Sequence, residues 1–160
     1  MAALSELPLT TRLFLKAYPW RRIDPVPWAS LRRPLREARI ALVTTAGLCL
    51  PTQEPFVHDV GGGDWTFREI PADADAKTLV DSHRSESYDH SGVQADANLA
   101  FPIDRIRELA AEGVIGSVNH RHFSFMGSIT APGRLTARSA LAVADALEGD
   151  AVHAVLLVPI

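Results

Sequence analysis

Cys49, the single cysteine of the chain, is the first residue whose type could support redox chemistry. It lies in the segment GLCLPTQEP, shortly after an apolar run. A thiol at the carboxyl end of a buried strand is well placed to be a nucleophile or a redox group. A lone cysteine is equally at home as a small buried hydrophobe. Because the chain has no CxxC pair, Cys49 has no resolving partner nearby in the sequence, and both interpretations stay open.

His120 and His122 form a second group. In an extended segment alternate side chains point to the same side, so both rings would face one way. Together with Asp89 or His90 they would offer ligands for Zn or Fe. The simpler interpretation is that they are hydrogen-bonded polar groups at the edge of a sheet.

The segment HFSFMG and the residues after it form a third group. Ser124, Ser128 and Thr130 offer hydroxyl and backbone N–H groups beside Gly127. Pro132 then leads into a predicted helix, and helix N-termini favour anions. We therefore expect a carboxylate or another anionic substrate group to dock here. Ordinary capping and turn chemistry is the alternative.

Alternating strands and helices are expected to position these groups. Residues 39–45 and 154–158 are apolar and rich in β-branched residues, which predicts strands buried on both faces, with 154–158 in the centre of a sheet. This order predicts an α/β fold, a Rossmann-like or flavodoxin-like layer sandwich with a mostly parallel sheet. The other expected elements are helices at 9–18, 74–82, 101–112 and 136–147, strands at 65–70 and 114–118, and a polar loop at 83–98.

Charge divides the chain into an N-terminal arm, residues 1–38, and an α/β domain, residues 39–160. Residues 1–39 hold eight of the 16 Lys and Arg residues but three of the 19 acidic ones. A basic arm can bind nucleic acid. Prolines interrupt this one and no nucleic-acid motif accompanies it, so we favour docking on the acidic domain or on another subunit.

The composition excludes several classes of protein. A hydrophobic content of 47% with 22% charged residues indicates a globular chain. One cysteine cannot form an intrachain disulfide and indicates a reducing compartment. There is no signal-peptide pattern, and no apolar run approaches the ~20 residues that span a bilayer. We therefore expect a cytoplasmic protein that binds neither nucleic acid nor membrane.

Several stretches of the sequence, among them FPIDR (101–105) and HFSFMG (122–127), resemble one known family, the selenoprotein B family of glycine, sarcosine, betaine and D-proline reductases. FPIDR and HFSFMG are the most specific of these, and the arm is similar to that of short, stand-alone bacterial members. The stretches are RIALVTTAGL (39–48), FREIPADAD (67–75), DHSGVQADANLAFPIDRIRELAAEGVIG (89–116), RHFSFMGSI (121–129) and AVLLVPI (154–160).

The resemblance implies a redox enzyme that reductively cleaves the bond between the α-carbon and nitrogen of a small amino-acid-like substrate. In the family a selenolate or thiolate of a U/C-x-x-C motif attacks, and a second thiol resolves the adduct. An ordinary thiol, with a pKa of ~8.5, is mostly protonated at pH 7, which favours selenium at this position. The resemblance also implies a thiol reductant protein or a partner subunit, and a homo-oligomer is a further expectation.

We expect the redox motif directly after strand 154–158, where this sequence departs from the family pattern. One hypothesis is that the codon after Ile160 is UGA, read as selenocysteine; any other codon in the genomic DNA would contradict it. The alternative is a chain cut at Ile160 for another reason. On the first hypothesis the visible residues supply the pocket. Its expected lining is Ser124, Met126, Gly127 and Ser128, with His122 or His90 as proton donor and Cys49 as a further catalytic candidate.

Two other functions stay open. The chain can be a non-catalytic or partner-dependent α/β module that binds another subunit through an apolar face and its basic arm. It can also be a metal enzyme that uses His120, His122 and Asp89.

Overall fold

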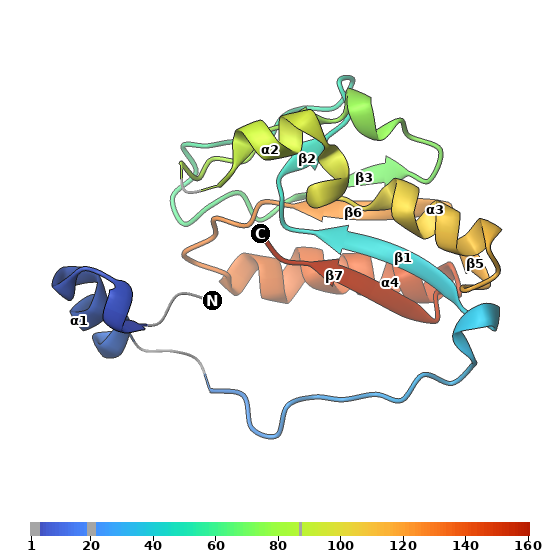
Figure 1. Ribbon diagram of the computed structural model, residues 1–160, viewed down its shortest axis with the longest axis horizontal. Helices are drawn as coiled ribbons and strands as arrows, with labels where there is room; N and C mark the ends of the chain where they lie inside the picture. The colour runs from blue at the N-terminus through green and yellow to red at the C-terminus, as the bar shows by residue number, and fades with distance from the viewer. Residues whose placement is uncertain (1–3, 19–21, 87) are drawn as a thin grey trace. The chain divides into compact units, whose positions relative to one another are not determined.

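The computed structural model describes residues 4–18, 22–86 and 88–160. The chain divides into two compact units, Met1–Ser30 and Leu31–Ile160. The first unit contains the 3-10 helix η1 (Leu4–Glu6) and the helix α1 (Leu9–Ala17). The boundary expected at residue 38 falls inside the second unit, where the short helix η2 (Leu35–Glu37) leads into the first strand (Figure 1).

The second unit is built on a five-stranded, mostly parallel sheet. Its central strand, β1 (Arg39–Thr44), pairs in parallel with β5 (Ser117–Val118) and β6 (Arg121–Phe125) along one side and with β7 (Ala154–Val158) along the other. β3 (Phe67–Pro71) adds to β6 in the antiparallel direction. A separate antiparallel pair is formed by β2 (Leu48–Cys49) and β4 (Val80–Asp81).

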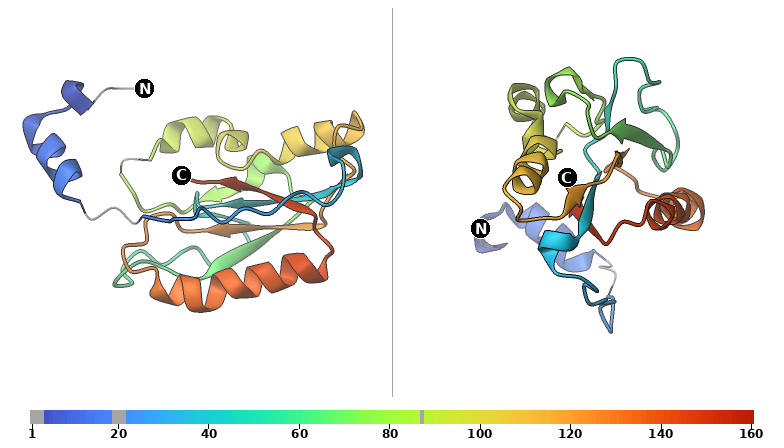
Figure 2. Two further views of the ribbon diagram at one scale, coloured as in Figure 1. Left: turned by 90° about the horizontal axis from the view of Figure 1, so that it is seen from below. Right: turned by 90° about the vertical axis from the view of Figure 1, so that its right-hand side faces the viewer.

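Helices cover both faces of the sheet (Figure 2). The helices α2 (His90–Ala95) and α3 (Ile103–Ala111) lie on one face, and α4 (Ala140–Gly149) lies on the other. The alternation of β1 serves both layers: Ile40 and Leu42 belong to the core that includes α3, whereas Ala41 belongs to the core that includes α4. This layered arrangement confirms the predicted α/β fold class.

Three predicted elements differ from the structure. The helix expected at 74–82 is one turn, η3 (Ala76–Thr78), capped by Asp75, because the chain then extends to pair Val80 with Cys49. The loop expected at 83–98 contains α2 and the 3-10 helix η4 (Ala97–Leu99). The helix expected at 136–147 begins as a π-helix, η5 (Leu135–Ser139), before α4.

The strand predicted at 154–158 is confirmed as β7, but its surroundings differ from the expectation. Within the described part of the chain, β7 pairs with β1 alone. Leu156 and Leu157 are 44% and 67% exposed. An apolar run in the sequence predicts a strand, but it does not show which other elements cover the side chains of that strand. Among the described residues, no helix has the length and apolar character needed to cross a membrane.

His122 supports the sheet where β5 gives way to β6. Ile40 and Val43 pair with Val118 and Phe123, so four residues of the partner segment lie opposite two of β1. In this bulge the backbone N–H of Leu42 donates to His122 Nδ1 at 3.0 Å, in place of a bond to a strand carbonyl. The ring is fully buried, and burial lowers the pKa of His122 to about 4.

This burial predicts a pH-dependent stability. The folded-state pKa of His122, about 4, lies below the ordinary value of 6.5. The contribution is therefore complete above pH 6.5 and is lost as the pH falls toward 4, by about 2–3 kcal/mol in the free energy of unfolding. His122→Asn keeps an acceptor for Leu42 but cannot titrate, so it should remove most of this loss. Urea unfolding at pH 7 and pH 4.5 measures it.

His120→Asn is the matched control, since the side chain of His120 is 68% exposed. It should retain the wild-type loss of stability at pH 4.5. The account of His122 is contradicted if His122→Asn and the wild type lose the same free energy of unfolding on acidification.

Candidate functional site

The two edges of the sheet differ in how their polar groups are used. At the amino edge, Arg121 Nε and Nη2 bond the carboxylate of Asp150 at 2.7 and 2.8 Å, and Asn119 Nδ2 adds a bond at 3.0 Å. The side-chain bond from Arg121 lowers the pKa of Asp150 to about 2. Arg121 and Asp150 thus satisfy each other through charge-assisted hydrogen bonds, whereas Asn119 Oδ1 is buried without a partner among the described residues.

The carboxyl edge is where β1, β6 and β7 end together, because all three run in the same direction. Ligands of open α/β sheets bind beyond this edge. A cavity of about 310 Å³ lies there, formed by the loop after β4, the loop after β6 and the residue that follows β7. Figure 1 shows the ends of β1 and β7 side by side. The lining residues are His83, Ser85, Tyr88, Asp89, Gly127, Ser128 and Ile160.

Gly127 is the point where these segments meet. A Cβ atom on Gly127 would lie 2.7 Å from the carbonyl oxygens of both Thr45 and Ile160, and 3.1 Å from His83 Nε2. Two backbone oxygens at that distance leave no room for a side chain, so space requires glycine here. The N–H of Ile160 also donates to Thr45 Oγ1 at 2.8 Å, which ties the ends of β1 and β7 together.

His83 lines the cavity and carries an unused hydrogen-bond donor that is buried beside Gly127. Its Nδ1 accepts from the backbone N–H of Ser85 at 3.2 Å, so the hydrogen-bond pattern assigns the proton of the neutral ring to Nε2. Nε2 is buried and has no hydrogen-bond partner among the described residues. Burial lowers the pKa of His83, which favours this neutral form.

Three side chains hold His83 in place. Asp81 Oδ1 accepts from the backbone N–H of His83 at 3.0 Å, and Asp81 Oδ2 lies 2.5 Å from His90 Nδ1. His90 Nε2 lies 3.1 Å from the carbonyl oxygen of Ser85. Both of these partners accept hydrogen bonds, so they favour a His90 ring that is protonated on both nitrogens. The hydrogen bond to Asp81 is the main cause, and it raises the pKa of His90. The ring of Tyr88 contacts that of His83, with centroids 4.5 Å apart, and burial raises the pKa of Tyr88 to about 12.

The structure brings some of the predicted site residues to this cavity and leaves others elsewhere. Gly127, Ser128 and Asp89 line it, and His90 supports it from behind. Apart from His120, four other predicted site residues are each no more than 1% exposed and are absent from the lining of this cavity, so their expected roles stay predictions. They are Cys49, His122, Ser124 and Met126.

Cys49 lies in the β2–β4 pair, with Sγ 3.8 Å from the carbonyl oxygen of Val80. Burial raises the pKa of Cys49, which keeps the thiol protonated at neutral pH. A nucleophile needs the thiolate, so this environment disfavours that role.

His120 and His122 do not face the same way. His120 lies outside β6 in the bulge and is exposed, whereas His122 points into the core. In the part of the chain that the structure describes, no group of three or more His, Cys, Asp or Glu side chains is placed to hold a metal ion.

Sequence reasoning did not single out His83. Its only sign was a histidine within a polar stretch, and nothing local to that stretch shows that it folds back against Gly127. The ring becomes a candidate once its buried Nε2 is seen without a partner.

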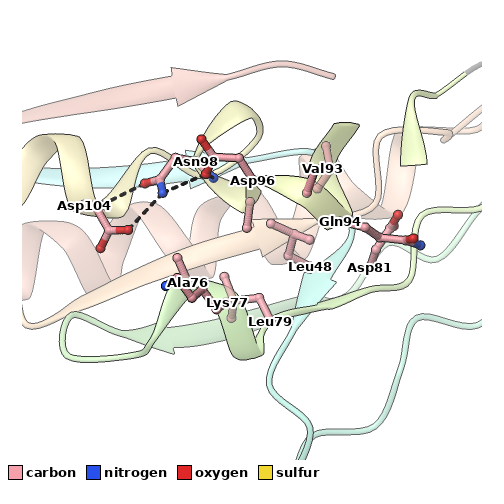
Figure 3. A pocket seen from close by; sticks show the side chains of 12 residues that line it. Leu48, Ala76, Lys77, Leu79, Asp81, Val93, Gln94, Asp96, Asn98 and Asp104 are labelled. Atoms are coloured by element: carbon pink, nitrogen blue, oxygen red, sulfur yellow. Dashed lines mark hydrogen bonds between the residues drawn. The ribbon is translucent and has the colours of Figure 1, made fainter. Parts of the chain in front are cut away.

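A second cavity of about 310 Å³ lies between η3, β4 and α2 (Figure 3). Leu48 and Val93 contribute apolar side chains to it. At its rim, Asn98 Nδ2 donates to Asp96 at 3.0 Å and to Asp104 at 2.9 Å. These polar groups already satisfy one another. We therefore take the carboxyl-edge cavity, with its unpaired donor, as the candidate site.

Fold and site together define an α/β protein with a small polar pocket beyond the ends of its parallel strands. The model of the glycine/sarcosine/betaine reductase selenoprotein B family matches residues 7–159. The chain belongs to this family, which confirms the membership indicated by its sequence stretches. No solved structure gives a significant match.

Curated relatives are subunits of reductases. The chain is 35% identical to D-proline reductase subunit gamma of Acetoanaerobium sticklandii over 84% of its own length and 54% of the relative. It is 32% identical to glycine reductase complex component B subunit gamma of Symbiobacterium thermophilum, over 88% of its length and 32% of the relative. It is 26% identical to betaine reductase complex component B subunit beta of Peptoclostridium acidaminophilum, over 90% of its length and 33% of the relative. The chain thus spans about half or less of these relatives.

The crowding at Gly127 predicts an effect of a single methyl group. Gly127→Ala should lower the free energy of unfolding by about 1–3 kcal/mol, because the ends of β1 and β7 and the ring of His83 must move apart. Gly133→Ala is the matched control, since a Cβ there meets nothing within 4 Å. Urea unfolding compares the two variants. Equal stabilities would show that the three segments do not meet at Gly127 as described.

Proposed function

We propose that this chain is a reductase component whose carboxyl-edge cavity binds a small amino-acid-like substrate. The observation that carries the proposal is that two residues of opposite character line one cavity. His83 has a buried N–H without a hydrogen-bond partner, and Asp89 has a carboxylate. Membership of the selenoprotein B family supports the reductase class.

The names of the relatives suggest the class of substrate. Glycine, sarcosine, betaine and D-proline all carry a carboxylate on the carbon next to nitrogen, and they differ in the substitution of that nitrogen. The proposed reaction replaces the Cα–N bond with a Cα–H bond. The nitrogen of glycine, sarcosine or betaine leaves as ammonia or an amine, whereas that of D-proline stays in the product as a primary amine because the ring opens. A dithiol supplies the two electrons and becomes a disulfide.

The nucleophile in this proposal is a thiol or selenol outside residues 1–160. Cys49 is the only cysteine of the sequence, and its thiol is buried and protonated. We propose that the group is a selenocysteine or cysteine that follows Ile160, or that it lies on a partner subunit. The described residues would then bind and orient the substrate beside it.

The test is a reductase assay on the complex that contains this chain, purified from its native host. With dithiothreitol as reductant, it should cleave the Cα–N bond of at least one of glycine, sarcosine, betaine and D-proline, with one dithiol oxidised per bond cleaved. Mass spectrometry of the products and a thiol titration measure both quantities. A complex that contains the chain and cleaves none of the four substrates contradicts the proposal.

One observation favours a second candidate, a non-catalytic module that binds another subunit. An apolar groove of about 330 Å³ runs between α4 and the sheet, lined by residues such as Val143, Val155 and Leu157. The same assay separates the two candidates. For a non-catalytic module, a complex rebuilt without this chain should keep its rate of substrate cleavage.

A further inference from the structure

We infer that the carboxyl-edge cavity recognises its substrate as a zwitterion, with His83 binding the carboxylate and Tyr88 and Asp89 binding the positively charged nitrogen. This inference rests on the proposed function and deepens it, because it assigns the two ends of the substrate to two sides of one cavity.

The His83 side suits an acceptor. Nε2–H is a donor held in a ring that is 6% exposed, and nothing among the described residues accepts from it. A buried donor without a partner destabilises the empty site, so an occupant that accepts this hydrogen is stabilised. A carboxylate oxygen is the strongest such acceptor, and Ser128, another polar residue, lines the same cavity.

The Asp89 side suits a cation. Asp89 Oδ1 accepts from the backbone N–H of Gly92 at 3.0 Å and from Ser91 Oγ at 2.9 Å. These hydrogen bonds lower the pKa of Asp89, so the carboxylate is charged at neutral pH. The same bonds anchor the side chain at the start of α2 and hold its charge at the cavity.

Tyr88 adds an aromatic ring to the cationic side. Tyr88 lines the same cavity and is the neighbour of Asp89 in the sequence. Its ring contacts the ring of His83. A quaternary ammonium has no N–H to donate, and aromatic rings bind such groups through the cation–π interaction. A ring beside a carboxylate therefore suits both primary and quaternary nitrogens.

Ligands with only one of the two charges fit this arrangement less well. A simple carboxylate meets the negative charge of Asp89 and leaves the ring of Tyr88 without a cation. A simple ammonium ion leaves the N–H of His83 unpaired. Only a small zwitterion satisfies both sides.

The first experiment needs no variant. Isothermal titration calorimetry on the full chain compares each of glycine, sarcosine, betaine and D-proline with the alcohol that replaces its carboxylate. Choline is the alcohol partner of betaine, and ethanolamine is that of glycine. The substrate that binds most tightly should bind about tenfold or more tighter than its alcohol, and tighter than acetate.

Two variants then test the assignment of each side. His83→Leu should weaken binding of the zwitterion about tenfold and leave the affinity for the alcohol unchanged. Asp89→Asn keeps an acceptor for the Gly92 N–H but removes the charge, so it should weaken both the zwitterion and the alcohol without weakening acetate. Asp145→Asn, on the exposed face of α4, is the matched control and should bind as the wild type does.

The outcomes separate this inference from the proposed function. Equal affinities for a zwitterion and its alcohol, or an unchanged affinity in a folded His83→Leu, overturn the inference while the reductase assay still decides the function. If none of the four zwitterions binds the wild-type chain, both the inference and the substrate-binding role are overturned.

Discussion

The close approach at Gly127 is the contact on which the candidate site depends. The carbonyl oxygens that end β1 and β7 and the ring of His83 all meet the space that a side chain would occupy. β1 and β7 are paired in parallel up to Thr44 and Val158, and the hydrogen bond between Ile160 and Thr45 continues this contact beyond the strands. The cavity exists because the loop after β6 can pass through so narrow a space.

Polar groups are distributed unequally between the two edges of the sheet. At the amino edge, Arg121 and Asp150 satisfy each other, which stabilises the start of β6 against the end of α4. At the carboxyl edge, Asp81 and His90 are satisfied, but the donor of His83 is left over. Other buried polar atoms of the described residues also lack a partner, among them Asn119 Oδ1, His122 Nε2 and Ser124 Oγ. His83 differs from these in that it lines the cavity, whose position agrees with where open α/β sheets bind ligands.

Much of the fold could be predicted from the sequence, because apolar runs and helical periodicity are local properties. They placed β1, β7 and α3 to within a few residues. The short helices that begin at Asp89 and Asp96 escaped, since side-chain caps start them and they carry little periodicity. In the site, the HFSFMG segment and the residue after it drew attention to Gly127 and Ser128, both of which line the cavity. It could not show that His122 and Ser124 lie in the core, because β6 is buried on both faces and its polar side chains are covered as fully as its phenylalanines. His83 could not be found at all, since its role depends on a contact with a loop more than 40 residues away.

Nuclear magnetic resonance of the histidine rings tests the central claim most directly, and the 17.4 kDa chain is well suited to it. Long-range proton–nitrogen spectra report the protonation of each ring nitrogen. The account predicts that free His83 carries its proton on Nε2, and that betaine or D-proline shifts this nitrogen while His120 stays unchanged. A His83 ring that is protonated on Nδ1, or that does not respond to a bound substrate, would contradict the account.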